Sequence, residues 1–186
     1  MKIYDTQIRR IMPNAPSSRI SEFVASFNKW CSTFGISSPL RASHYIAQVA
    51  HETGELRYME ELSSGAQYEG RKDLGNIHPG DGVRYKGRGY LQTTGRSNYQ
   101  RYASSKYCNG DLMSHPEWLS RSPGNQKSSM FFWMVNGLNE LSDFDDVKSV
   151  TKRVNGGYNG LESRMYYTRR AKSVFNIKRE EAKKQV

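Results

Sequence analysis

The chain has 186 residues, enough for one domain with a substantial buried core. Its 3 Trp, 12 Tyr and 7 Phe exclude an intrinsically disordered chain. Lys and Arg number 28 against 18 Asp and Glu, and this formal net charge of +10 favours polyanionic partners such as nucleic acid, anionic envelope polymers or a membrane face, without choosing among them. A solvated surface with a basic C-terminal tail at about 177–186 would give the same balance.

Two helices are predicted in the N-terminal part of the chain. Residues 18–34 carry apolar side chains at i, i+3 and i+4 spacing. A second helix is predicted over 39–54, with Ser38 as its N-cap and a proline in its first turn. Glu52 therefore falls in the last turn of this helix.

The segment 54–100 has a different composition. Glycine recurs through it and regular apolar periodicity disappears, so we expect a long loop with a short strand or hairpin at about 85–94. Long loops inside a compact domain are usually functional or disordered, and the aromatic content here excludes disorder. This segment is predicted to line a cleft.

Helices are predicted again after this segment. Residues 122–137 are apolar nearly all round, which places them in the core. A further helix is predicted to open at Ser142, with three aspartates in its first turn, and a last helix runs from about Gly160 into the basic tail. The predicted architecture is mainly α, of α+β type through the short hairpin.

Cysteines and termini bear on the compartment. Cys31 and Cys108 are far apart and have no metal-ligand spacing, so we interpret them as free thiols of a protein made in a reducing compartment. The first residues lack the apolar core of a signal peptide, and no segment approaches the roughly 18 apolar residues of a membrane helix. We therefore expect synthesis in the cytoplasm without an export signal.

Acidic residues around 52–61 indicate a chemistry. The negative end of the helix dipole favours the protonated form of Glu52, which is what a general acid requires. Glu60 and Glu61 follow past a glycine, and a chain leaving a helix can fold back over that distance. Two carboxylates across a gap are the components of glycoside hydrolysis, although glutamates are more often solvated surface residues.

Other chemistries fail on spacing. Position 55 is Glu, so no H-E-x-x-H zinc motif exists, and neither a dinucleotide fingerprint nor a G-x-S-x-G elbow is present. His44 and His51 share a helix face, where a packed or hydrogen-bonded pair is the common outcome. We expect no metal and no cofactor, because the four histidines are widely spaced.

Four motifs in order resemble glycoside hydrolase family 19, the chitinase family that also supplies many phage endolysins. The matching segments are His51-Glu52-Thr53-Gly54, Tyr85-Lys86-Gly87-Arg88-Gly89-Tyr90-Leu91-Gln92, Asn98-Tyr99 and Val154-Asn155-Gly156-Gly157. The segment from Tyr68 to Gly82 is similar to the endolysin-type branch. The resemblance covers about 40–170 and implies a lysozyme-like, bilobal fold in a single catalytic domain over 1–186.

The resemblance also implies roles. Glu52 corresponds to the catalytic acid and Glu61 to the base, with Ser63 beside the base and Thr94 as the hydroxyl that holds the attacking water. An inverting mechanism is implied, with the two carboxyl groups about 6.5–9.5 Å apart. Glu60 and Glu69 remain alternative bases, and Glu55 stands where the family commonly has a second glycine.

The remaining candidates are sugar-binding residues. Amide side chains can bond hydroxyl and N-acetyl groups, and tyrosines can stack on sugar faces, although core packing is an equally frequent role for tyrosine. Arg88 can instead anchor its loop or pair with a catalytic carboxylate. The predicted substrate-binding residues are Tyr85, Arg88, Gln92, Thr94, Asn98, Asn155 and Arg164, with Tyr90 and Tyr99 as further stacking candidates.

The leading hypothesis is an endolysin-like enzyme that cuts β-1,4 bonds between N-acetylated sugars of peptidoglycan, as a monomer, at the cell wall after holin-type release. A chitinase with the same chemistry is the alternative, and an inactive glycan-binding protein is a remote one. A nucleic-acid-binding protein is disfavoured because the basic residues form no recognition helix or stacking motif.

Overall fold

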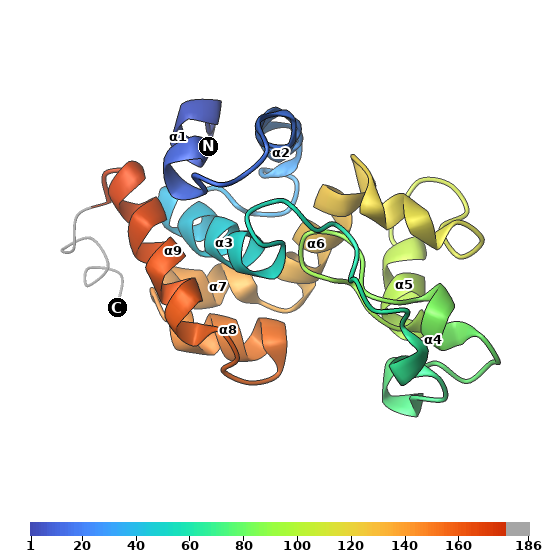
Figure 1. Ribbon diagram of the computed structural model, residues 1–186. Coiled ribbons are helices and arrows are strands. Elements are labelled where there is room, and N and C mark those ends of the chain that lie inside the picture. The colour runs from blue at the N-terminus through green and yellow to red at the C-terminus, as the bar shows by residue number, and fades with distance from the viewer. Residues whose placement is uncertain (178–186) are drawn as a thin grey trace. The chain divides into compact units, whose positions relative to one another are not determined.

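The computed structural model describes residues 1–177, and regular structure in this range is almost entirely helical (Figure 1). Nine α-helices and three short 3-10 helices lie there, and strand structure in the same range is limited to two isolated antiparallel bridges. The mainly helical prediction is confirmed. The predicted basic tail lies outside the described residues from position 178 on.

The chain divides into two compact units. The first comprises Met1–Arg57 and the chain from Trp133 onward, and the second comprises Tyr58–Phe132. The boundary at Trp133 falls inside helix α6 (Gly124–Val135). Each predicted catalytic carboxylate therefore belongs to a different unit, Glu52 to the first and Glu61 to the second.

The first unit is a helical assembly around α3, which packs against α9, α7 and α8 (Figure 1). Every side chain of α3 from Ala42 to Ala50 is buried. Tyr45 packs edge-on against Trp133, with ring centroids 5.2 Å apart. The helices of this unit are α1 (Asp5–Ile11), α2 (Ser17–Trp30), α3 (Pro39–Glu52), α7 (Leu138–Asp143), α8 (Val147–Asn155) and α9 (Leu161–Val174).

Local sequence fixes both ends of α3. The Ser38 hydroxyl accepts a hydrogen bond from the Arg41 backbone N–H, as predicted for an N-cap. At the other end the Thr53 hydroxyl donates to the Val49 carbonyl and accepts from the Leu56 N–H, each at 2.7 Å. These contacts end the helix directly after Glu52 and turn the chain away from it.

Two predicted helix boundaries are wrong. Ser142 lies in the last turn of α7, and α8 begins only at Val147, with Asp146 as its N-cap. Asp145 separates the two helices because its backbone has a φ of 55°, which no α-helix accommodates. The last helix, α9, ends at Val174 rather than in the tail. Helix α1 has no counterpart among the predicted helices.

The second unit depends on loop contacts more than on regular structure. It contains η1 (Ala66–Tyr68), η2 (Lys72–Leu74), α4 (Asp81–Arg84), α5 (Arg96–Ala103), η3 (Pro116–Ser120) and most of α6. Asp81 is buried and accepts hydrogen bonds from the guanidinium of Arg96 and from the backbone N–H groups of Ile77 and His78. This carboxylate thereby joins α4, α5 and the preceding loop.

The expected hairpin at about 85–94 is reduced to isolated bridges. Arg88 bridges Thr93 on one side and Glu60 on the other. Gly89 and Gln92 have left-handed backbones, with φ of 81° and 51°, and these interrupt any longer strand. The pairing that survives sets residues 59–61 beside 87–89, through Glu61 N–H to Gly87 O and Gly89 N–H to Met59 O.

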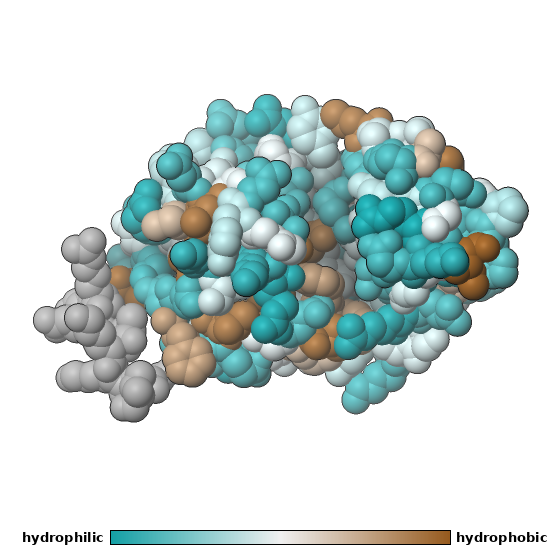
Figure 2. All heavy atoms as spheres, turned by 90° about the horizontal axis from the view of Figure 1, so that it is seen from below, coloured by the Kyte–Doolittle hydropathy of each residue, from teal (hydrophilic) through white to brown (hydrophobic). Residues whose placement is uncertain are grey.

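The surface drawn in Figure 2 is mainly hydrophilic, with scattered apolar residues. Within residues 1–177, no helix combines the length and the apolar character needed to cross a membrane.

Replacing Asp81 with Asn should destabilise the protein, because it leaves the Arg96 charge without its partner. We expect a loss of about 2–4 kcal/mol in the free energy of unfolding, measured by urea titration at pH 7. The hydrogen bond from Arg96 lowers the pKa of Asp81 from 3.8 to about 2. The stabilisation is therefore complete above about pH 4 and is lost as the pH falls towards 2. An unchanged pH dependence in the variant would contradict this assignment.

Candidate active site

In the first unit the site is centred on Glu52, the last residue of α3. Its Oε1 accepts a hydrogen bond from the Arg164 guanidinium at 2.5 Å, and Arg164 also donates to the Gln48 amide oxygen and, at 3.2 Å, to the Asn159 carbonyl. Arg164 is 1% exposed. Among the described residues, Oε2 of Glu52 has no hydrogen-bond partner, so this oxygen is available to a ligand.

His51, the residue before Glu52, is partly buried and hydrogen-bonded. The Nδ1 atom of His51 lies 3.0 Å from the Ser163 hydroxyl. Burial, followed by the nearby charge of Arg164, lowers the pKa of His51 although Glu52 acts in the opposite direction. Its ring covers Gly160, where an added Cβ would lie 2.1 Å from the ring, so glycine is required there. His44 lies elsewhere, 2.9 Å from Asp145.

Glu55, which stands where the family commonly has a second glycine, lies in the turn after Glu52. Glu55 has a φ of 62°, a backbone conformation that glycine adopts freely and that other residues adopt at a cost of about 1 kcal/mol. Its buried carboxylate accepts hydrogen bonds from the backbone and side-chain N–H groups of Asn14 and from the Tyr167 hydroxyl. The glycine-type turn is thus retained, and these three bonds offset the strain.

In the second unit the site is centred on Glu61. Oε1 accepts a hydrogen bond from the Ser63 hydroxyl and Oε2 accepts one from the Tyr68 hydroxyl, each at 2.9 Å. Gln67 in turn donates to Ser63 at 2.7 Å. One donated hydrogen bond on each oxygen fixes the orientation of the carboxyl group. Glu61 is therefore held as an oriented carboxylate with lone pairs to spare.

Gly87 allows three oxygens to gather beside Glu61. A Cβ added at Gly87 would lie 2.8 Å from Gln92 Oε1, 3.0 Å from Glu61 Oε2 and 3.2 Å from Thr94 Oγ1. Thr94 donates its own proton to the Gln92 carbonyl at 2.8 Å, so its lone pairs remain free to accept. The structure thus brings Glu61, Ser63, Gln92 and Thr94 together in one group, which we call the Glu61 cluster.

Glu60 and Glu69, the two alternative bases, have structural partners. Glu60 pairs with Lys86 at 2.9 Å and with Arg88 at 3.3 Å, and accepts from the Ser120 hydroxyl. Burial alone would raise the pKa of Glu60, but its bonds to Lys86 and the charge of Arg88 lower it overall. Glu69 accepts hydrogen bonds from the backbone N–H groups of Gly80 and Gly82 and so closes its loop.

The three candidate stacking tyrosines are core residues. Tyr85, Tyr90 and Tyr99 are at most 1% exposed, and the rings of Tyr85 and Tyr99 pack 5.2 Å apart. No ring face is left for a sugar. Arg88 is also buried, and beyond Glu60 it donates to the Arg84 carbonyl and the Tyr99 hydroxyl. Arg88 thus anchors its loop, which is the alternative role considered above.

The two asparagines differ from the tyrosines because they are exposed. Asn98 donates through its amide to the Thr94 carbonyl at 2.7 Å, and Asn155 ends α8 in the first unit. Both retain polar atoms at the surface. Arg164, predicted to bind substrate, is buried and contacts Glu52 instead.

Two residues of the site could not be predicted from the sequence. Tyr68 lies within the segment that resembles endolysins, and its contact with Glu61 depends on the η1 turn. Lys86 belongs to one of the family-like motifs. Its side chain pairs with the carboxylate of Glu60 and donates to the backbone carbonyl of Glu61, so it neutralises Glu60 and, in the part of the chain that the structure describes, leaves the Glu61 carboxylate without an ion pair. Spacing from Glu61 carried no signal for either contact.

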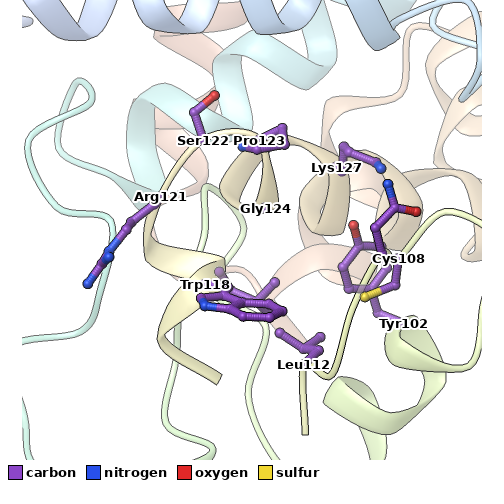
Figure 3. Close-up of a pocket in the computed structure, with 11 residues that line it drawn as sticks. Tyr102, Cys108, Leu112, Trp118, Arg121, Ser122, Pro123, Gly124 and Lys127 are labelled. Atoms are coloured by element: carbon purple, nitrogen blue, oxygen red, sulfur yellow. The ribbon is translucent and has the colours of Figure 1, made fainter. Parts of the chain in front are cut away.

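A separate cavity of about 220 Å³ lies in the second unit (Figure 3). Trp118, Leu112 and Tyr102 give it a largely apolar lining, with Cys108 and Lys127 at one side. None of the predicted site residues lines it. Within residues 1–177, no group of His, Cys, Asp and Glu side chains is arranged to hold a metal ion.

The Tyr68 contact can be tested without measuring activity. Burial, and then the hydrogen bond to Glu61 and its charge, raise the pKa of Tyr68 above 10. Glu61→Gln should lower this pKa, followed by NMR of ring-labelled tyrosine, because the neutral amide removes the charge. Glu60→Gln is the matched control and should leave it unchanged. Equal effects of both variants would contradict the contact between Tyr68 and Glu61.

Sequence comparison finds relatives that include a glycosyl hydrolase family 19 domain protein and an endochitinase. No protein-family model matches the chain. A Haemophilus influenzae protein described as a glycosyl hydrolase family 19 domain-containing protein is 26% identical over 196 residues, which cover 88% of this chain and 92% of that protein. An Arabidopsis thaliana endochitinase is 30% identical over 136 residues, 73% of this chain, although the match spans only 46% of that relative.

Solved structures show the same fold. Chitinase C from Streptomyces griseus superposes with a TM-score of 0.74 at 18% identity, over 94% of this chain and 92% of that one. A family GH19, class IV chitinase from Zea mays gives a TM-score of 0.73 at 19% identity, over 95% and 94%. The predicted lysozyme-like fold is confirmed. The chain is thus similar in sequence to a glycosyl hydrolase family 19 domain protein over 88% of its length, and it shares the fold of the family 19 chitinases.

Proposed function

We propose that this enzyme is an endolysin-like peptidoglycan hydrolase that cleaves β-1,4 bonds between N-acetylated amino sugars with inversion. The observation that carries the mechanism is the Glu61 cluster, in which an oriented carboxylate and a free hydroxyl acceptor share one face of Gly87. This is the arrangement that a water-activating base requires.

Glu52 is the proposed general acid. Arg164 occupies Oε1, so the proton is carried on Oε2, the oxygen with no described partner. Oε2 is therefore the oxygen from which Glu52 would donate a proton to the leaving oxygen of the glycan.

Glu61 is the proposed base. A water molecule that donates one proton to Glu61 and the other to Thr94 would direct a lone pair at the sugar. The Gln92 amide can orient the same water or an N-acetyl group. Ser63 and Tyr68 hold Glu61 in one orientation, so its carboxyl group need not reorganise during the step.

The proposed substrate is peptidoglycan, and the site of action is the bacterial cell wall, reached by holin-type release. The net charge of +10 suits an anionic envelope. The segment from Tyr68 to Gly82 is similar to endolysins. Within it, the Tyr68 hydroxyl donates to Glu61, and Glu69 accepts the two backbone hydrogen bonds that shape the loop. Chitin is the second candidate, favoured because the Arabidopsis thaliana relative and the structural neighbours named above are chitinases.

Digestion of purified peptidoglycan and of chitin oligomers in parallel tests the substrate. We expect new amino-sugar reducing ends, identified by mass spectrometry, mainly from peptidoglycan. Glu52→Gln, which keeps the shape of the side chain, should lower the rate by about 10²–10⁴-fold with the circular dichroism spectrum unchanged. Release from chitin alone would establish a chitinase, and an undiminished rate in the variant would exclude Glu52 as the acid.

The neighbouring glutamates provide a matched pair for locating the base. Glu61→Gln should lower kcat by at least about 10²-fold because an amide cannot take a proton from water. Glu60→Gln should retain most of kcat and instead lower the free energy of unfolding by about 1–3 kcal/mol, since Lys86 and Arg88 lose their partner. The reverse pattern would move the base to Glu60.

A further inference from the structure

A basic hollow of about 430 Å³ lies in the first unit, on α9 and the end of α1. Four of its residues on α9 follow i, i+3, i+4, i+7 spacing and so share one helix face. Their side chains offer hydrogen-bond donors and no carboxylate. The lining consists of Arg10, Tyr166, Arg169, Arg170, Ser173 and Val174.

Contacts within the protein position one wall of this hollow. Arg170 donates to the Arg10 backbone carbonyl, which joins α9 to α1, and to the Tyr166 hydroxyl at 2.5 Å. Its guanidinium also lies over the Tyr166 ring, 5.8 Å from the centroid. Arg170 is therefore held in place before any ligand arrives, which reduces the entropy lost on binding.

The positive charge of the hollow is not neutralised by the protein. Within residues 1–177, Arg10, Arg169 and Arg170 form no ion pair, whereas Arg19, Arg41, Arg71 and Arg96 each pair with a carboxylate. Arg10 and Arg169 are exposed. Three guanidinium groups around one hollow concentrate a positive potential that an anion can satisfy.

The hollow is distinct from the proposed active site. Arg164, the partner of Glu52, lies on the buried face of α9 with Thr168 and Ala171. Arg169 and Arg170 lie on the other face and roughly 8 Å further along the helix axis. An anion in the hollow would therefore leave the Glu52 contact undisturbed.

We propose that this hollow binds a phosphate group, as a second site independent of glycan cleavage. Guanidinium groups form paired hydrogen bonds with phosphate oxygens, and several of them match its charge better than they match a single carboxylate. Ser173 and Tyr166, which also line the hollow, carry hydroxyl groups. The phosphate is supplied either by the headgroup of an anionic lipid or by a small anion in solution.

The test uses the full chain with two probes at constant ionic strength. Inorganic phosphate is titrated while NMR follows the Nε–H signals of the arginines. Cosedimentation with phosphatidylcholine vesicles, with and without phosphatidylglycerol, measures lipid binding. Arg10→Gln with Arg169→Gln should weaken binding to the anionic vesicles about thirty-fold. Binding of phosphate alone would identify a small anion as the ligand, and binding of vesicles would identify the lipid headgroup.

Two further variants keep the proposal falsifiable. Arg101→Gln with Lys106→Gln removes the same charge from exposed positions of the second unit and should change binding less than about twofold. Arg10→Lys with Arg169→Lys keeps the charge but removes the forked donors, and should lose most of the phosphate binding. Three results would overturn the site. They are an equal loss of binding in the two double glutamine variants, full phosphate binding in the double lysine variant, and binding of neither probe by the unmodified protein.

Discussion

A buried guanidinium, that of Arg164, joins α9 to α3 through Gln48 and Glu52. A buried charge is tolerated only when it is paired and its donors are satisfied, since desolvation costs several kcal/mol. Glu52 supplies the opposite charge, and the Asn159 carbonyl accepts a further bond. The same ion pair therefore holds α9 against α3 and fixes the orientation of the proposed acid, Glu52. A substitution that removes the Arg164 guanidinium, or that shortens Glu52 so that no acceptor remains, would disturb the packing of the unit as well as its chemistry.

Helices that bury an apolar stripe could be predicted from the sequence, because periodicity reports burial directly. The helices over 18–34, 39–54 and 122–137 match α2, α3 and α6. The break between α7 and α8 could not be predicted in this way. It depends on Asp145, whose left-handed backbone is stabilised by contacts with His44 and Lys172 that are distant in sequence. Short helices such as α4, which rely on Asp81 and Arg96, gave no periodic signal either.

In the candidate site, too, some residues could be predicted from local sequence, whereas others depend on tertiary contacts. Glu52 was accessible to sequence reasoning because its position at a helix end has a local electrostatic meaning. The association of Ser63 and Thr94 with Glu61 was implied by the resemblance to family 19, and Gln92 was predicted only as a sugar-binding residue. The geometry around Gly87 brings the oxygens of Glu61, Gln92 and Thr94 together. Tyrosines 85, 90 and 99 were assigned partly to sugar stacking, since a sequence cannot say which aromatic residues a loop will bury. The choice between Glu60 and Glu61 needed the positions of Lys86 and Arg88.

The central claim is that Glu61 activates a water molecule rather than attacking the sugar itself. Its two hydrogen-bonded oxygens and the free acceptor of Thr94 support a base, whereas a nucleophile would form a covalent intermediate and retain the anomeric configuration. Proton NMR of the first products released from a soluble substrate, recorded before mutarotation, distinguishes the two. We predict that the new reducing ends appear initially as the α anomer from the β-linked substrate. Initial formation of the β anomer would contradict the account.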